Sequence, residues 1–138
     1  MANHIYHDLD SARKVLPEVR KLMNLLMGLH RSLEVLDGIE VENESDDPKL
    51  EVTIAELNME FHKKMYLYYT YLRKLVALGA IVKDLDMGLV DFYSKHNGKD
   101  ILLCWMYGEE EISHWHSTTD GFDERMPIDI LEKKSRTR

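Results

Sequence analysis

Apolar residues recur every three or four positions along two long stretches in the first half of the chain. Residues 18–36 and 49–78 both follow this pattern, which places the apolar side chains on one face of an α-helix. Two long helices with matching faces predict an antiparallel helical hairpin. The first face is a leucine stripe of Leu22, Leu25, Leu26, Leu29, Leu33 and Leu36. The second face is mixed and consists of Ile54, Leu57, Phe61, Met65, Tyr68, Leu72, Leu75 and Leu78.

Capping and helix-breaking residues set the predicted ends of these helices. Asp8 is a predicted N-cap, because its carboxylate can accept a hydrogen bond from a free amide of the first turn. Pro17 lacks an amide donor, so the pattern predicts a short helix at 10–16 and then a kink or a fresh start. Gly38 and Gly79 suit the two helix ends. The acidic residues 39–47 are predicted to form a solvated loop.

Apolar and polar residues alternate after Gly79, which is typical of half-buried strands. Strands are predicted at 81–85, 89–93, 101–107 and 111–117, with a short edge strand at 5–7. Asn97 and Gly98 form a strong hairpin signal, because both residues tolerate positive φ. The chain is therefore predicted to be one α+β domain over residues 1–130, a long antiparallel helical hairpin packed against an antiparallel β-meander of three to four strands. A basic, disordered tail is predicted at 131–138.

Composition narrows the class of protein. A length of 138 residues favours one domain. The formal charge of −7 repels phosphate backbones, so no nucleic-acid partner is expected. The apolar runs are shorter than the ~20 residues of a membrane helix, so no membrane partner is expected either. A single cysteine, Cys104, and an N-terminus without a signal-peptide pattern favour the reducing cytoplasm.

Groups able to bind a metal gather in the predicted sheet region. The candidate ligands are Cys104, His114, His116, Asp91 and Glu109, because thiolate, imidazole and carboxylate suit zinc or iron. His114 and His116 share one face of a strand. Cys104 joins that face only if the turn after Tyr107 has an odd number of residues, and an even number places it on the opposite face.

The same residues also fit a purely structural role. Asp91, Glu109, His116 and Arg125 are predicted to form a polar cluster, in which arginine pairs with a carboxylate and fixes the C-terminal segment to the sheet. Cys104 then acts as a small buried hydrophobe, and Trp105 and Trp115 act as core residues. The sequence has no glycine-rich phosphate loop and no His-Glu-x-x-His pattern.

The second helix is unusually rich in tyrosine. Tyr66, Tyr68, Tyr69 and Tyr71 give it an apolar surface wider than one stripe, which two helices and a small sheet do not cover. Tyrosine is enriched where proteins meet. We therefore expect a homodimer that pairs through the helical hairpin. The alternative is a monomer whose amphipathic tyrosines lie along its surface.

The second half of the chain also carries a recognisable set of short motifs. They are Gly88-Leu89-Val90-Asp91-Phe92, Leu103-Cys104-Trp105, Gly108-Glu109, Ile112, Trp115-His116, Gly121-Phe122 and Arg125-Met126-Pro127. With these motifs the chain resembles a domain-of-unknown-function family of small bacterial and archaeal proteins. The resemblance implies a helical hairpin with a small sheet, and it implies no activity.

Two functional hypotheses follow. The first is a small cytoplasmic homodimeric binding or assembly module without catalysis and without a cofactor, and it expects packed tryptophans and a packed Cys104. The second is a metal-binding protein or metal-dependent enzyme that holds zinc or iron with His114, His116 and one of Cys104, Asp91 or Glu109. It expects three donors about 2.0–2.3 Å from a common point.

Overall fold

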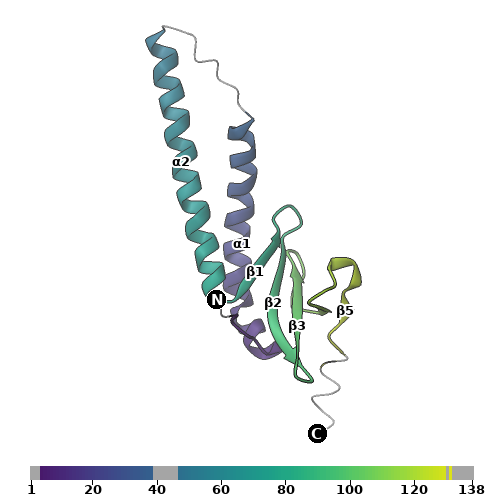
Figure 1. Cartoon of the computed structure of the whole chain (residues 1–138). Helices are drawn as coiled ribbons and strands as arrows, with labels where there is room; N and C mark the ends of the chain where they lie inside the picture. The colour runs from purple at the N-terminus through teal and green to yellow at the C-terminus, as the bar shows by residue number, and fades with distance from the viewer. Residues whose placement is uncertain (1–3, 39–46, 130, 132–138) are drawn as a thin grey trace.

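The predicted α+β architecture is confirmed by the computed structural model, which describes residues 4–38, 47–129 and 131. Two helices form the hairpin, α1 (Leu9–Asp37) and α2 (Pro48–Ala77). One antiparallel sheet follows, in the order β1 (Ala80–Asp84), β2 (Leu89–His96), β3 (Lys99–Met106), β4 (His114–Ser117) and β5 (Met126–Pro127), with a 3-10 turn η1 (Phe122–Glu124) before β5 (Figure 1).

The sheet has five strands, so the predicted three to four was wrong. The extra strand is β5, which pairs with β4 through only two residues, Met126 and Pro127. A two-residue strand is too short to show alternation, so its sequence carries no periodic signal. The predicted edge strand at 5–7 is reduced to an isolated bridge between Tyr6 and Tyr93.

Helix α1 begins where the sequence predicts but does not restart at Pro17. The Asp8 side chain accepts from the Ser11 amide at 2.7 Å and caps the helix. The helix then runs on through Pro17 to Asp37. Leu16 and Val19 are buried on either side of the proline, so packing of both flanks into the core outweighs the local cost of the missing amide. At the other end of the hairpin, Gly79 follows α2 with a φ of +82°, as its predicted role requires.

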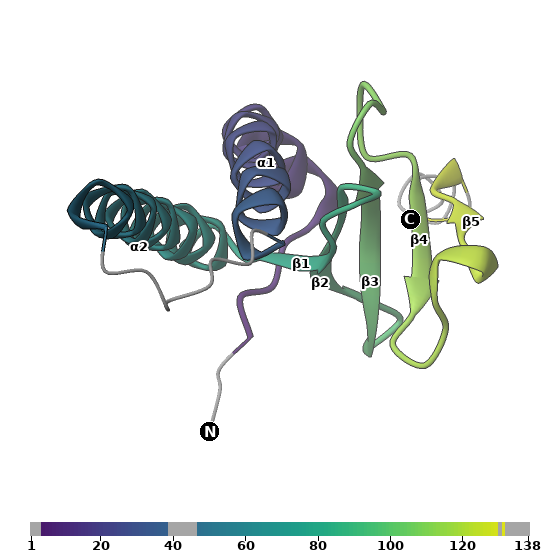
Figure 2. The ribbon, with the colours of Figure 1, turned by 90° about the horizontal axis from the view of Figure 1, so that it is seen from above.

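Only one face of the sheet packs against α1. Val90, Phe92, Leu103 and Trp105 are fully buried on this face and join the buried side chains of α1 in one core. Figure 2 shows α1 lying over the sheet while α2 lies to its side, beside α1 and near β1. Helix α2 is therefore peripheral, and Leu75 is its one buried residue.

Strand register decides which side chains share the other face. Asn97 and Gly98 both have positive φ and form the predicted hairpin turn between β2 and β3. Strand β4 starts at His114, later than predicted, which leaves the seven residues 107–113 as its connection to β3. Cys104 pairs with His114 and Leu102 pairs with His116. This is the pairing predicted for an odd-numbered connection, so Cys104 lies on the same face as His114 and His116.

Two predictions fall largely outside the described residues. These are the acidic loop at 39–47, of which only Asp47 is described, and the tail at 131–138, of which only Leu131 is described. Leu131 packs against the hydrophobic core. Within the described ranges, none of the helices has the length and hydropathy needed to cross a membrane.

Candidate functional site

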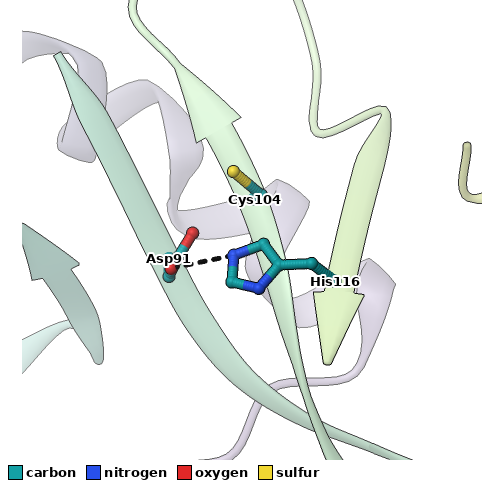
Figure 3. Close-up of side chains that lie close together, drawn as sticks. All are labelled: Asp91, Cys104 and His116. Carbon is teal, nitrogen blue, oxygen red and sulfur yellow. Dashed lines mark hydrogen bonds and ion pairs between the residues drawn. The ribbon is translucent and has the colours of Figure 1, made fainter. Parts of the chain in front are cut away.

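Polar side chains from three neighbouring strands meet on the face of the sheet that points away from α1. Asp91 of β2 pairs with Cys104 of β3, and Cys104 pairs with His114 of β4. His116 lies two residues farther along β4, on the same face. Figure 3 shows Asp91, Cys104 and His116 together in front of the strands, with the ribbon of α1 behind.

Asp91, Cys104 and His116 form a buried polar triad. Their exposed fractions are 1%, 0% and 3%. His116 Nε2 lies 3.1 Å from Asp91 Oδ2. One donor atom from each residue lies within 4.8 Å of the other two. Burial of three polar groups in contact is costly unless each finds a partner, so their hydrogen bonds decide what the triad can do.

One nitrogen of His116 has a fixed role. Its Nδ1 lies 2.8 Å from the carbonyl oxygen of Ser117. A carbonyl oxygen can only accept, so Nδ1 carries a proton and donates it. The other nitrogen, Nε2, faces the Asp91 carboxylate. In the neutral ring with its proton on Nδ1, Nε2 carries a lone pair that can accept a hydrogen bond or bind a metal ion.

Asp91 is incompletely satisfied. Its Oδ2 contacts His116, whereas its buried Oδ1 has no hydrogen-bond partner among the described residues. A buried carboxylate oxygen without a partner carries a desolvation cost of about 1–3 kcal/mol or more. Oδ1 thus lacks a well-aligned donor, although the Cys104 thiol interacts with the same carboxylate.

Cys104 is held as a neutral thiol by its surroundings. Burial raises its pKa to about 12, and the negative charge of Asp91 adds to the increase. The Arg125 guanidinium acts in the opposite direction but does not compensate. Without a further cation, Cys104 is therefore a poor nucleophile at neutral pH, since only the thiolate reacts.

A second group of polar contacts surrounds Glu109, in the connection between β3 and β4. The Glu109 carboxylate accepts from the Met106 amide at 2.6 Å and from Arg125 Nη1 at 3.1 and 3.3 Å. Its backbone carbonyl accepts from Trp105 Nε1 at 2.9 Å. The Arg125 guanidinium also stacks on the Phe122 ring, 4.4 Å from its centroid. Glu109 and Arg125 thus link the segment before β5 to the sheet.

His114 belongs to this second group. Its Nδ1 lies 3.5 Å from Glu109 Oε2 and 2.9 Å from the Ser113 hydroxyl. The structure therefore sorts the predicted candidates into the triad of Asp91, Cys104 and His116 and the neighbouring contacts of Glu109, His114 and Arg125. Arg125 links the two groups, because it acts on both Cys104 and Glu109.

A group that the sequence interpretation missed lies between α1 and the β1–β2 turn. His30 Nε2 lies 3.0 Å from Glu34 and 3.5 Å from Asp86. The i,i+4 spacing of His30 and Glu34 signals part of it, but the contribution of Asp86 depends on the fold. Both carboxylates are exposed, and an exposed cluster of this kind is an ion-pair network that stabilises little.

Comparison with protein families gives a match over most of the chain. The model of a family described as an uncharacterised conserved protein (DUF2203) matches residues 5–128. Neither the curated proteins nor the solved structures contain a match to the chain. The matched range covers both helices and all five strands, including every member of the triad.

Proposed function

The chain belongs to the uncharacterised conserved family DUF2203, and from its own geometry we propose that it is a non-catalytic homodimeric binding module that pairs through α2. The observation that carries this proposal is a regular row of exposed side chains along that helix. A single buried thiol, Cys104, is compatible with a reducing cytoplasm as the site of action.

The outward face of α2 has the spacing of a coiled-coil seam. Its positions alternate three and four residues apart, which is the a/d pattern by which two helices pair. All of them are exposed, and Met59 and Tyr66 reach 68% and 74%. We call this row the α2 seam, and it consists of Val52, Ala55, Met59, His62, Tyr66, Tyr69, Arg73 and Val76.

The four tyrosines of α2 divide between two faces. Tyr68 and Tyr71 are half-buried and pack against the core. Tyr66 and Tyr69 are exposed and lie on the α2 seam. The predicted surplus of apolar surface on this helix is thus a separate face, pointing away from the core. A row of exposed aromatic and aliphatic side chains marks an interaction surface.

Charge on α2 favours a second copy of the same helix as the partner. Residues 48–62 hold three glutamates and one lysine, whereas residues 63–77 hold three lysines, one arginine and no carboxylate. An antiparallel second copy brings the acidic half of one helix against the basic half of the other. A parallel copy places like charges together, which is unfavourable.

The antiparallel pairing also matches the seam residue by residue. When Val52 lies opposite Val76 of the second copy, Met59 lies opposite Tyr69 and His62 lies opposite Tyr66. The middle of the seam has an open hollow of about 720 Å³, lined by Met59, His62 and Tyr66 among others. The side chains of a second copy can fill this hollow around the two-fold axis, which is the requirement of an isologous interface.

Sedimentation of the untagged protein over a range of concentrations tests the proposal. We expect the wild-type chain to dimerise and Tyr66→Asp to raise the dissociation constant at least about 30-fold, the effect of losing one interface hot spot. Val35→Asp is the matched control, because Val35 is 68% exposed, close to the 74% of Tyr66, but lies on α1. A monomeric wild type, or equal effects of the two folded variants, would refute the pairing.

A further inference from the structure

We propose that Asp91, Cys104 and His116 form a binding site for one borderline-soft divalent cation, zinc in the first place. This inference goes beyond the dimer and does not depend on it. The three side chains come from three adjacent strands, are buried, and place one donor atom each within 4.8 Å of the other two (Figure 3).

The hydrogen bond of His116 to the backbone is the first argument. Because Nδ1 donates to the Ser117 carbonyl, the ring orientation is fixed and Nε2 is turned toward Asp91. Zinc-binding histidines have this arrangement, with one nitrogen on the metal and the other N–H donating to a carbonyl or carboxylate. A cation between Nε2 and the carboxylate binds the lone pair of the neutral ring.

The unpartnered oxygen of Asp91 is the second argument. Oδ1 is buried and has no hydrogen-bond partner among the described residues, although it belongs to a carboxylate that has a histidine and a cysteine as neighbours. A bound cation supplies the missing partner. It also stabilises the thiolate of Cys104, so that one carboxylate and one thiolate balance its two positive charges.

The spacing of the donors suits a small ion. Ligands about 2.0–2.3 Å from a tetrahedral zinc lie roughly 3.3–3.8 Å from one another. The three donor atoms are already within 4.8 Å of one another, so small side-chain rotations close the site. Sulfur and imidazole ligands favour zinc over magnesium or calcium, which prefer all-oxygen sites.

Cobalt(II) and zinc titrations of the untagged, metal-free protein test the site. We expect one equivalent of cobalt to give thiolate-to-cobalt charge transfer and tetrahedral ligand-field bands, and one equivalent of zinc to displace it. The wild-type spectrum reports sulfur ligation directly, so it decides the question even if a variant fails to fold. Binding without a thiolate band, or no binding to the folded or refolded chain, would overturn the proposal.

Four variants assign the ligands. Cys104→Ser must abolish the charge-transfer band, and His116→Gln must lower zinc affinity by more than the about 10–100-fold that loss of an outer-shell partner costs. His114→Gln is the matched control on the same strand face, and we expect it to bind zinc normally. His30→Gln removes the imidazole of the exposed cluster. If it abolishes zinc binding while Cys104→Ser does not, the proposed site is wrong.

Discussion

The Glu109–Arg125 ion pair offers a direct measurement of how the C-terminal segment is held on the sheet. Glu109→Gln preserves side-chain shape and leaves an oxygen to accept from the Met106 amide, but it removes the charge that faces Arg125. Arg125→Met preserves much of the packing on Phe122 and removes the guanidinium. The hydrogen bond from Trp105 goes to the backbone carbonyl of residue 109, so neither substitution removes it.

The expected effect follows from burial and contact geometry. Removing one partner of a fully buried ion pair costs about 3–5 kcal/mol, whereas an exposed pair contributes about 0–1 kcal/mol. The Glu109 and Arg125 side chains are 18% and 13% exposed and make two contacts at 3.1 and 3.3 Å. We therefore expect each single variant to lower the free energy of unfolding by about 2–3 kcal/mol.

A double-mutant cycle isolates the pair. Urea unfolding of the wild type, Glu109→Gln, Arg125→Met and the double variant is followed by tryptophan fluorescence. All four are measured at one protein concentration, since the stability of the proposed dimer would depend on concentration. We expect a coupling free energy of about 1.5–3 kcal/mol, the value of a hydrogen bond between charged groups. A coupling below about 0.5 kcal/mol would show that the two sites behave independently and that the pair does not fix the segment.

Three further predictions concern single positions. Asp8→Ala is expected to cost about 1 kcal/mol at pH 7. The hydrogen bond from the Ser11 amide holds the pKa of Asp8 below 3.8. The contribution of this cap to the unfolding free energy is therefore present above that pH and is lost as the pH falls through the lowered pKa. The Asp8→Asn variant should keep its cap in acid, because asparagine does not titrate. Cys104 of metal-free protein, with its pKa raised to about 12, should react with a thiol reagent at neutral pH only as fast as the protein unfolds, and rapid labelling of the folded state would contradict its burial. Gly88→Ala should destabilise the protein more than Gly98→Ala in thermal unfolding. Both glycines have positive φ, which costs alanine about 1–2 kcal/mol. A Cβ at position 88 would also lie 2.5 Å from the Tyr107 Cβ, whereas a Cβ at position 98 would have no atom within 4 Å.

The fold could be predicted where a pattern extends over many residues or where an element depends only on residues close to it in sequence. The two helices, the Asn97-Gly98 turn and the caps at Asp8 and Gly79 all depend on neighbouring residues, and the structure confirms them. The leucine stripe of α1 is confirmed only in part, because Leu25 is 39% exposed and the buried face also contains Met23 and Met27. Pro17 and β5 depend instead on distant contacts. Packing of both flanks of Pro17 into the core overrides its local preference, and β5 exists because Met126 and Pro127 lie against β4.

The triad likewise combines features that the sequence predicts with features that depend on distant contacts. The sequence identified Asp91, Cys104 and His116 as candidates. Whether they share one face of the sheet depended on whether the β3–β4 connection has an even or an odd number of residues, and Gly108 allows either. In the structure Cys104 lies opposite His114 and Leu102 lies opposite His116, and this pairing places Cys104 and His116 on one face. A hydrogen bond from His116 to a backbone carbonyl could be expected from the sequence, but the choice of Nδ1 as donor and of Ser117 as acceptor depends on the folded strand.

We propose that two copies pair antiparallel through the α2 seam. The most direct test is the distance between two spin labels, one on each copy of a Val52→Cys variant. Native Cys104 is buried and should not take the label. Val52 lies twelve residues from the seam midpoint at residue 64, so with a rise of 1.5 Å per residue the antiparallel dimer predicts labels about 36 Å apart. A separation near the interaxial distance of about 10 Å, or no dipolar signal between molecules, would contradict the account.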